Sequence, residues 1–182
     1  TGAVWMDRNL GATQVATSST YANSYGDLFQ WGRGDDGHQD RSSSTTSTNA
    51  DTPGHGDFIT EGSSPYDWRS NQDDNLWNGE SATNNPCPSG WRIPTETEWE
   101  AERTTDFTSN NAAGAFGSVL KLPMASARNR SDGSLYYVGT HGRYWSSTVS
   151  GTNARNLNFN ISTADMGTSN RAYGHSVRCI KD

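Results

Sequence analysis

The side chains that could carry out catalysis are scattered along the chain without the spacing of known catalytic motifs. There is no HExxH zinc motif, no GxSxG nucleophile elbow, no P-loop and no GxGxxG sequence opening a helix. Four histidines remain, all in glycine-rich surroundings without metal-ligand spacing: His38, His55, His141 and His175. Loop or surface positions are the simpler interpretation of these histidines. We therefore predict that the chain is not an enzyme.

Carboxylates and amides gather between Asp67 and Glu80, and these hard oxygen ligands are the ones that calcium prefers. The segment lacks EF-hand spacing, so two alternatives stay open. Asp73 and Asp74 could hold a structural Ca²⁺, or they could be surface carboxylates that accept hydrogen bonds within turns. The sequence requires no other cofactor.

A third set of side chains suits binding. Between residues 136 and 175, tyrosines, arginines and histidines alternate with small polar residues. Antibody paratopes share this mixture, because tyrosine supplies a large rigid contact area and small polar residues adapt their hydrogen bonds. An ordinary polar sheet edge would have the same composition, and that alternative stays open. The candidate ligand contacts are Tyr136, Tyr137, His141, Arg143, Tyr144, Asn153, Arg155, Asn160, Ile161, Thr163, Asp165, Thr168, Asn170, Arg171, Tyr173 and His175.

The composition indicates the type of scaffold that positions these residues. The 182 residues suit one domain, residues 1–182, and only 31% of them are hydrophobic. The 7 Trp, 7 Tyr and 5 Phe must therefore supply most of the buried surface. The abundant Gly, Ser, Thr, Asn and Asp favour turns and short strands. We predict an α+β domain with short antiparallel strands, one or two helices and long ordered loops.

The charge pattern excludes some partners. The formal net charge is −6 and no Lys/Arg cluster is present, so the sequence argues against nucleic acid and anionic membranes as partners. The chain has no apolar run of about 20 residues, the length that a membrane-spanning helix needs. We therefore expect no membrane insertion.

One helix is predicted over residues 92–103. Thr95 can cap it, Glu98 can complete a capping box, and Trp99 would face the core. A second helix around 111–120 is weakened by its two glycines. Strands are predicted at 4–6, 134–138, 144–148, 155–161 and 176–180. In the strand 155–161, Leu157, Phe159 and Ile161 would share the buried face, and the asparagines between them the solvent face.

Residues 33–85 form a long polar insertion that aromatic residues punctuate too often for a disordered linker. We expect an ordered loop region held against the core by its Trp and Tyr side chains. Cys87 and Cys179 are the only cysteines, and their separation excludes a CxxC motif. They are either one long-range disulfide, which we favour together with an oxidising compartment, or two buried thiols.

Five segments together resemble the Fibrobacter succinogenes major paralogous domain family. They cover residues 4–12 (VWMDRNLGA), 25–33 (YGDLFQWGR), 85–95 (NPCPSGWRIPT), 144–147 (YWSS) and 174–181 (GHSVRCIK). That family resembles the formylglycine-generating-enzyme branch of the C-type-lectin fold. The resemblance implies paired terminal strands, a helix after the Pro-Thr-Glu segment, and a ligand face formed by the C-terminal half.

The chain also departs from its relatives in that fold. Formylglycine-generating enzymes carry a copper-binding pair of cysteines near their C-terminal end, where this chain has Cys179 alone. The Glu-Pro-Asn and Trp-Asn-Asp calcium motifs of sugar-binding animal lectins are missing too. Both differences favour a non-catalytic domain that binds its ligand without calcium.

The same branch includes variable proteins of diversity-generating retroelements, in which mutagenesis of template adenines replaces Asn codons. The chain resembles such a product, with residues 127–179 as the variable ligand-binding region. This implies an extracellular adhesion domain, on a cell surface or virion, that binds a protein or glycan on another cell surface. The alternatives are a degenerate relative of the enzymes and a structural module of a large surface protein.

Overall fold

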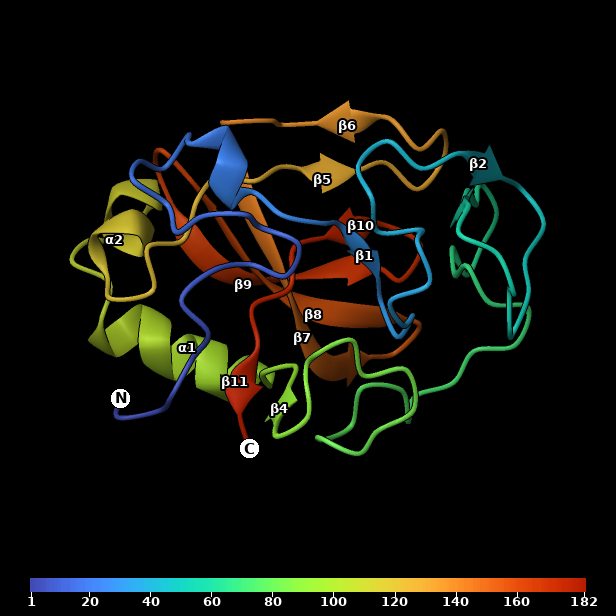
Figure 1. Cartoon of the computed structure of the whole chain (residues 1–182), viewed down its shortest axis with the longest axis horizontal. Helices are drawn as coiled ribbons and strands as arrows, with labels where there is room; N and C mark the ends of the chain where they lie inside the picture. The colour runs from blue at the N-terminus through green and yellow to red at the C-terminus, as the bar shows by residue number, and fades with distance from the viewer.

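The longest strands form a three-stranded antiparallel sheet in the order β7-β8-β9. In the computed structural model, which describes residues 1–182, these strands are β7 His141–Ser150, β8 Asn153–Asn160 and β9 Ala164–Asn170. Tyr144, Leu157 and Met166 lie in one cross-strand row, on the face that packs against the two helices (Figure 1). Gly142 lies opposite Phe159, and a Cβ at Gly142 would be only 2.1 Å from the Phe159 ring. Glycine is therefore required at that position.

Helix α1, Glu96–Thr105, begins with the predicted capping box. Thr95 Oγ1 accepts from the Glu98 amide at 3.3 Å, and Glu98 Oε2 accepts from the Thr95 amide at 2.7 Å. The helix begins four residues later than predicted, because residues 91–92 form strand β4, Trp91–Arg92. Trp99 is fully buried, as expected, and its indole nitrogen donates to the Trp145 carbonyl at 3.0 Å.

Helix α2, Ala112–Gly117, is the second predicted helix and is shorter than the sequence indicated. Asn111 caps it by accepting from the Gly114 amide at 3.2 Å. Its last turn ends at Gly117, where glycine stabilises a helix poorly. Neither helix is long and apolar enough to cross a membrane.

Very short strands make up the rest of the sheet structure. They are β1 Phe29–Gln30, β10 Gly174–His175, β5 Ala127–Arg128 and β6 Leu135–Tyr136, in the order β1-β10-β5-β6. Parallel bridges from Ser126 to Gly142 and from Tyr144 to Ser176 join this sheet to β7. The arrangement of two helices with mainly antiparallel sheets is α+β, as predicted.

The two ends of the chain lie side by side (Figure 1). Strand β11, Ile180–Lys181, pairs with β4, and Trp5 forms an antiparallel bridge to Ile180. The Lys181 amide donates to the Val4 carbonyl at 2.8 Å. The predicted strand at 4–6 is thus reduced to one bridge, although the expected pairing of the ends is present.

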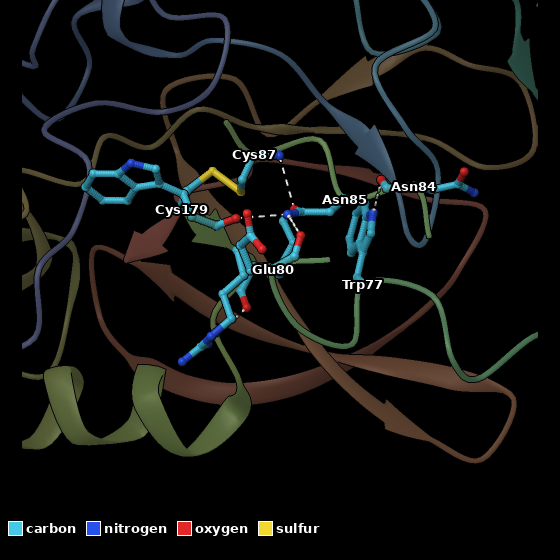
Figure 2. Close-up of a disulfide and its surroundings, with 9 residues drawn as sticks. Trp77, Glu80, Asn84, Asn85, Cys87 and Cys179 are labelled. Atoms are coloured by element: carbon cyan, nitrogen blue, oxygen red, sulfur yellow. Dashed lines mark hydrogen bonds between the residues drawn. A yellow bond between two sulfur atoms is a disulfide. The ribbon is translucent and has the colours of Figure 1, made fainter. Parts of the chain in front are cut away.

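Cys87 and Cys179 form a disulfide, with their Cα atoms 6.0 Å apart, and no free cysteine remains (Figure 2). Asn85 holds the loop that carries Cys87. Its Oδ1 accepts from the Cys87 amide at 3.1 Å, and its Nδ2 donates to the Glu80 carbonyl at 2.8 Å. Of the two alternatives that the sequence left open, the disulfide is confirmed. It joins the last strand to the loop before α1.

The polar segment 33–85 contains one pair of short strands, β2 Thr45–Thr46 and β3 Phe58–Ile59, which run parallel. Trp68 and Trp77 from this segment are fully buried in the same cluster as Trp31 and Trp145. The segment is therefore packed on the core by its aromatic side chains.

Candidate ligand-binding surface

The strand register gathers several candidate residues on the sheet face opposite the helices. His141 pairs with Asn160, and Arg143 lies in one row with Asn158 and Asp165. Because side chains alternate along a strand, these residues point away from the face that holds Tyr144 and Leu157. The three strands thus present a polar face formed by residues from both halves of the β8–β9 hairpin.

Tyrosine rings collect beside this face. The ring centroids of Tyr136 and Tyr137 are 4.7 Å apart, and Tyr136 is 6.1 Å from Tyr173. The Tyr137 ring lies 4.2 Å from the His141 ring and is 47% exposed. Tyr137 also has φ of 60°, which is uncommon for an aromatic residue. The structure therefore brings together tyrosines from β6 and from the segment before β10.

Two arginines flank the rings. The Arg143 guanidinium lies 5.7 Å from the centre of Tyr136 and 5.5 Å from that of Tyr137. The Arg130 guanidinium lies 3.9 Å from Tyr66 and 5.7 Å from Tyr173. We define the tyrosine–arginine cluster as Tyr66, Arg130, Tyr136, Tyr137, His141, Arg143 and Tyr173.

Sequence reasoning missed two members of the cluster, Tyr66 and Arg130. Tyr66 belongs to the polar insertion and reaches the cluster through a hydrogen bond from the Ala172 amide to its carbonyl, at 3.1 Å. No local signal predicts that long-range contact. Arg130 follows strand β5 and lay inside the expected variable region, where the tyrosines nearby were the only signal that could have singled it out.

The two arginines are the charged residues of the tyrosine–arginine cluster, because its tyrosine and histidine side chains are neutral. Burial raises the pKa of Tyr136 to about 12, even though the positive charges of Arg143 and Arg130 lower it. Burial also lowers the pKa of His141, and the Arg143 charge adds to that effect. At neutral pH the tyrosine is therefore a protonated hydrogen-bonding group, and the histidine is neutral.

Three expected contact residues are buried, which corrects their assignment. Tyr144 is 0% exposed, its hydroxyl donates to the Pro123 carbonyl at 2.7 Å, and Asn9 donates to that hydroxyl at 3.2 Å. His175 is also 0% exposed and lies 4.2 Å from the Trp145 ring. Tyr144 and His175, together with Arg171, therefore belong to the buried scaffold of the domain.

Arg171 is 1% exposed and forms a salt bridge with Asp74. Its guanidinium lies 4.6 Å over the Trp31 ring. Asp73, the other calcium candidate, accepts from the Asn75 amide at 2.9 Å. The two carboxylates thus have separate protein partners, and no group of three acidic, His or Cys side chains suited to a metal forms there or elsewhere.

The remaining candidates lie apart from the cluster. Asn153 and Asn170 are joined by a 2.8 Å hydrogen bond at the other end of the β8–β9 hairpin. Strand β8 ends at Asn160, so Ile161, which was predicted to be buried, lies in the hairpin turn and is 78% exposed. Thr163 is exposed in the same turn.

Arg155 points to the helix side, where its Nε donates to Glu96 Oε1 at 2.7 Å, and Thr168 lies opposite Arg155 in register. Arg155 lines an open groove of about 650 Å³ between α1 and the sheet, together with Arg103 and Met166. Both groove arginines are paired with glutamates, Arg155 with Glu96 and Arg103 with Glu100. Their charges are therefore already neutralised.

No family model, curated protein or solved structure matches the chain. The geometry alone must therefore indicate the function. The tyrosine–arginine cluster offers aromatic faces, hydroxyls and guanidinium groups, which bind ligands by stacking and hydrogen bonding.

Proposed function

We propose that the chain is a non-catalytic ligand-binding domain with a C-type-lectin-like fold, and that the tyrosine–arginine cluster is its binding surface. The observation that carries the proposal is the convergence of Tyr136, Tyr137 and Tyr173 with two arginines on one side of the molecule. Tyrosine and arginine are enriched among the residues that dominate binding energy at interfaces.

The assignment to the C-type-lectin fold is supported by the way the chain closes. The paired ends and the capped helix agree with what the sequence resemblance implies, and the disulfide joins the last strand to the loop before that helix. The proposed binding surface lies mainly in the C-terminal third, within the C-terminal half that the resemblance implies for the ligand face. A ligand that binds there would leave the helices on the other side of the sheet free.

We propose further that this surface is diversified by a retroelement and is displayed outside the cell, on a bacterial surface or a virion. Its partner is then a protein or glycan on another cell surface. The division of the candidate residues into an exposed group and a buried group supports this proposal, because a variable surface needs an invariant scaffold. The disulfide supports an oxidising compartment.

The rival enzyme function needs a pair of thiols near the C-terminal end, as the resemblance to formylglycine-generating enzymes implies. Here the Cys179 sulfur is bonded to Cys87 and no free cysteine remains. This observation supports binding without catalysis. Turnover of a cysteine-containing peptide by the purified chain would contradict that part of the proposal.

Sequencing the coding locus from a population of the source organism tests the diversification. We expect substitutions at exposed codons such as those of Tyr137, Thr163 and Asp165, and a template repeat that differs only at adenines. We expect none at Tyr144 or His175, because both side chains are fully buried. A uniform locus without a template repeat would contradict the retroelement proposal.

A ligand screen tests the binding surface itself. Arrays of purified bacterial surface proteins and glycans are probed with the wild-type chain, with Tyr137→Ala and with Thr97→Ala. Thr97 is exposed on α1, on the other side of the sheet, and serves as the matched control. Ligands should be lost with Tyr137→Ala and kept with Thr97→Ala, and equal binding by all three proteins would contradict the proposed site.

A further inference from the structure

Arg143 is the one arginine whose side chain donates no hydrogen bond within the chain. The side chain of every other arginine donates to a carboxylate, an amide, a hydroxyl or a backbone carbonyl. A guanidinium carries five N–H donors, and the contacts of Arg143 with the Tyr136 and Tyr137 rings include no hydrogen bond. Its hydrogen-bonding capacity is therefore unused.

The inner part of this side chain is shielded from water. Arg143 Nε is buried and has no acceptor, and Asn158 Oδ1, directly across the strand pair, is buried without a donor. The two terminal nitrogens of Arg143 also donate to no group of the chain, so they can bind a ligand from a strand position that the pairing with Asn158 fixes.

Arg130, at the other edge of the cluster, also has N–H donors that bond to no group of the chain. Its one hydrogen bond runs from Nη1 to the Glu61 carbonyl at 2.8 Å, and its Nε is buried without an acceptor. No salt bridge of the chain includes Arg130 or Arg143. In a chain of net charge −6, the cluster thus has two cations without a carboxylate partner.

The pKa shifts of neighbouring groups are consistent with an arginine that has no carboxylate partner. Burial lowers the pKa of His175 well below its usual value, and the next contribution is the positive charge of Arg143. Arg143 also acts on Tyr136 and His141, and no carboxylate acts on any of these three groups. The carboxylate in the same cross-strand row, Asp165, accepts from Asn158 Nδ2 at 3.4 Å and not from either arginine.

We infer that Arg143 and Arg130 bind carboxylates of the ligand, and that the ligand is an acidic segment of a protein. A carboxylate is the natural partner of an unpaired guanidinium, because the planar fork of donors matches its two oxygens. Exposed apolar residues beside the cluster favour a protein over a glycan, since Leu135 is 40% exposed and Val138 50% exposed. The inference rests on the proposed function of this surface and names its partner class.

The test is an NMR titration of the full chain, observing the arginine Nε–H resonances. The probes are a short oligoglutamate peptide, an oligoglutamine peptide of equal length, and an oligogalacturonate, which carries carboxylates on a glycan. The variants are Arg143→Gln, Arg130→Gln and, as the matched control, Arg8→Gln. Arg8 is paired with Asp7, and its replacement changes the net charge by the same amount.

Oligoglutamate should shift the Arg143 and Arg130 resonances, and oligoglutamine should not. Arg143→Gln should weaken oligoglutamate binding about tenfold or more, as expected for the loss of a charge-assisted pair. Arg8→Gln should weaken it less than about twofold, because Arg8 lies outside the cluster and its charge reaches the peptide only as a screened interaction. If Arg143→Gln does not fold, Arg130→Gln provides the comparison.

Three results would overturn the inference: no shift of either resonance with oligoglutamate, equal weakening by Arg8→Gln, or shifts produced by oligogalacturonate alone. The last result would assign the arginines to an acidic glycan. None of them touches the proposed binding surface, which falls only if Tyr137→Ala leaves every ligand of the screen bound. The two failures are therefore distinguishable.

Discussion

Replacing Tyr144 and Tyr137 separately tests the division between scaffold and surface. Tyr144 is fully buried between Trp99 and Phe159, with ring centroids 5.7 Å from each, whereas Tyr137 is 47% exposed. Removal of a buried aromatic ring destabilises a protein by about 3–5 kcal/mol. Tyr144→Ala also leaves the Pro123 carbonyl without its donor, so we expect a loss of about 4–5 kcal/mol in the free energy of unfolding.

Tyr137→Ala should change the free energy of unfolding by less than about 1 kcal/mol, because half-exposed rings contribute little burial. Tyr144→Phe is the intermediate variant. It keeps the packed ring and removes only the hydroxyl, which bonds to Pro123 and Asn9, so a loss of about 1–2 kcal/mol is expected. Tyr144→Ala should therefore be the least stable of the three variants and Tyr137→Ala the most stable, with Tyr144→Phe between them.

Urea unfolding followed by tryptophan fluorescence measures all three variants. The slope of free energy against urea must stay constant for the comparison to hold. Equal losses for Tyr144→Ala and Tyr137→Ala would refute the reasoning, because the strand register that buries Tyr144 would then be wrong. Tyr144 would return to the set of ligand contacts.

Two further predictions concern the scaffold. The disulfide closes a loop of 92 residues, so the double variant Cys87→Ala/Cys179→Ala should lose about 4–5 kcal/mol from loop closure, and a loss under about 1 kcal/mol in urea unfolding would contradict this. Burial lowers the pKa of His38 to about 4, and its Nε2 accepts from the Gln30 amide at 3.0 Å, so the folded state needs the neutral ring. The free energy of unfolding should therefore fall by up to about 3 kcal/mol between about pH 6.5 and pH 4, as the unfolded chain alone takes up the proton, and His38→Gln should fall less over the same range.

Local signals in the sequence predicted the parts of the fold that depend on local physics. The capping box of Thr95 and Glu98 determines where α1 begins, because both hydrogen bonds form within one turn. The alternation around Leu157 and Phe159 indicated strand β8 and its helix-facing side correctly. The solvent face expected for the asparagines is wrong at Asn156, which is 1% exposed and pairs with the buried Trp145. Most other strands have two residues, which is too short for any periodicity to be recognised.

The error over Tyr144 has a specific cause. Strand β7 lies between two core clusters, with Tyr144 in one and Trp145 in the other, so neighbouring residues are both buried. Where consecutive residues of a strand are buried on both faces, as at Tyr144 and Trp145, no polar side indicates which way each side chain points. The sequence shows Tyr144 as one more tyrosine in a polar tail, and only the tertiary packing distinguishes it from Tyr137.

Asn156 is the position where diversification and folding would conflict. It is 1% exposed and lies beside Gly167, and every asparagine codon begins with two adenines, so adenine mutagenesis would reach it. Its Oδ1 has no hydrogen-bond partner, and a substitution would therefore break no bond of the scaffold. Volume is then the remaining constraint: a small residue such as serine would fit, whereas a tyrosine ring would need room between Gly167 and the buried Trp145, its two register partners. In a diversified population we therefore expect small residues or asparagine at 156, beside wider variation at Asn160, which is partly exposed at the end of the same strand.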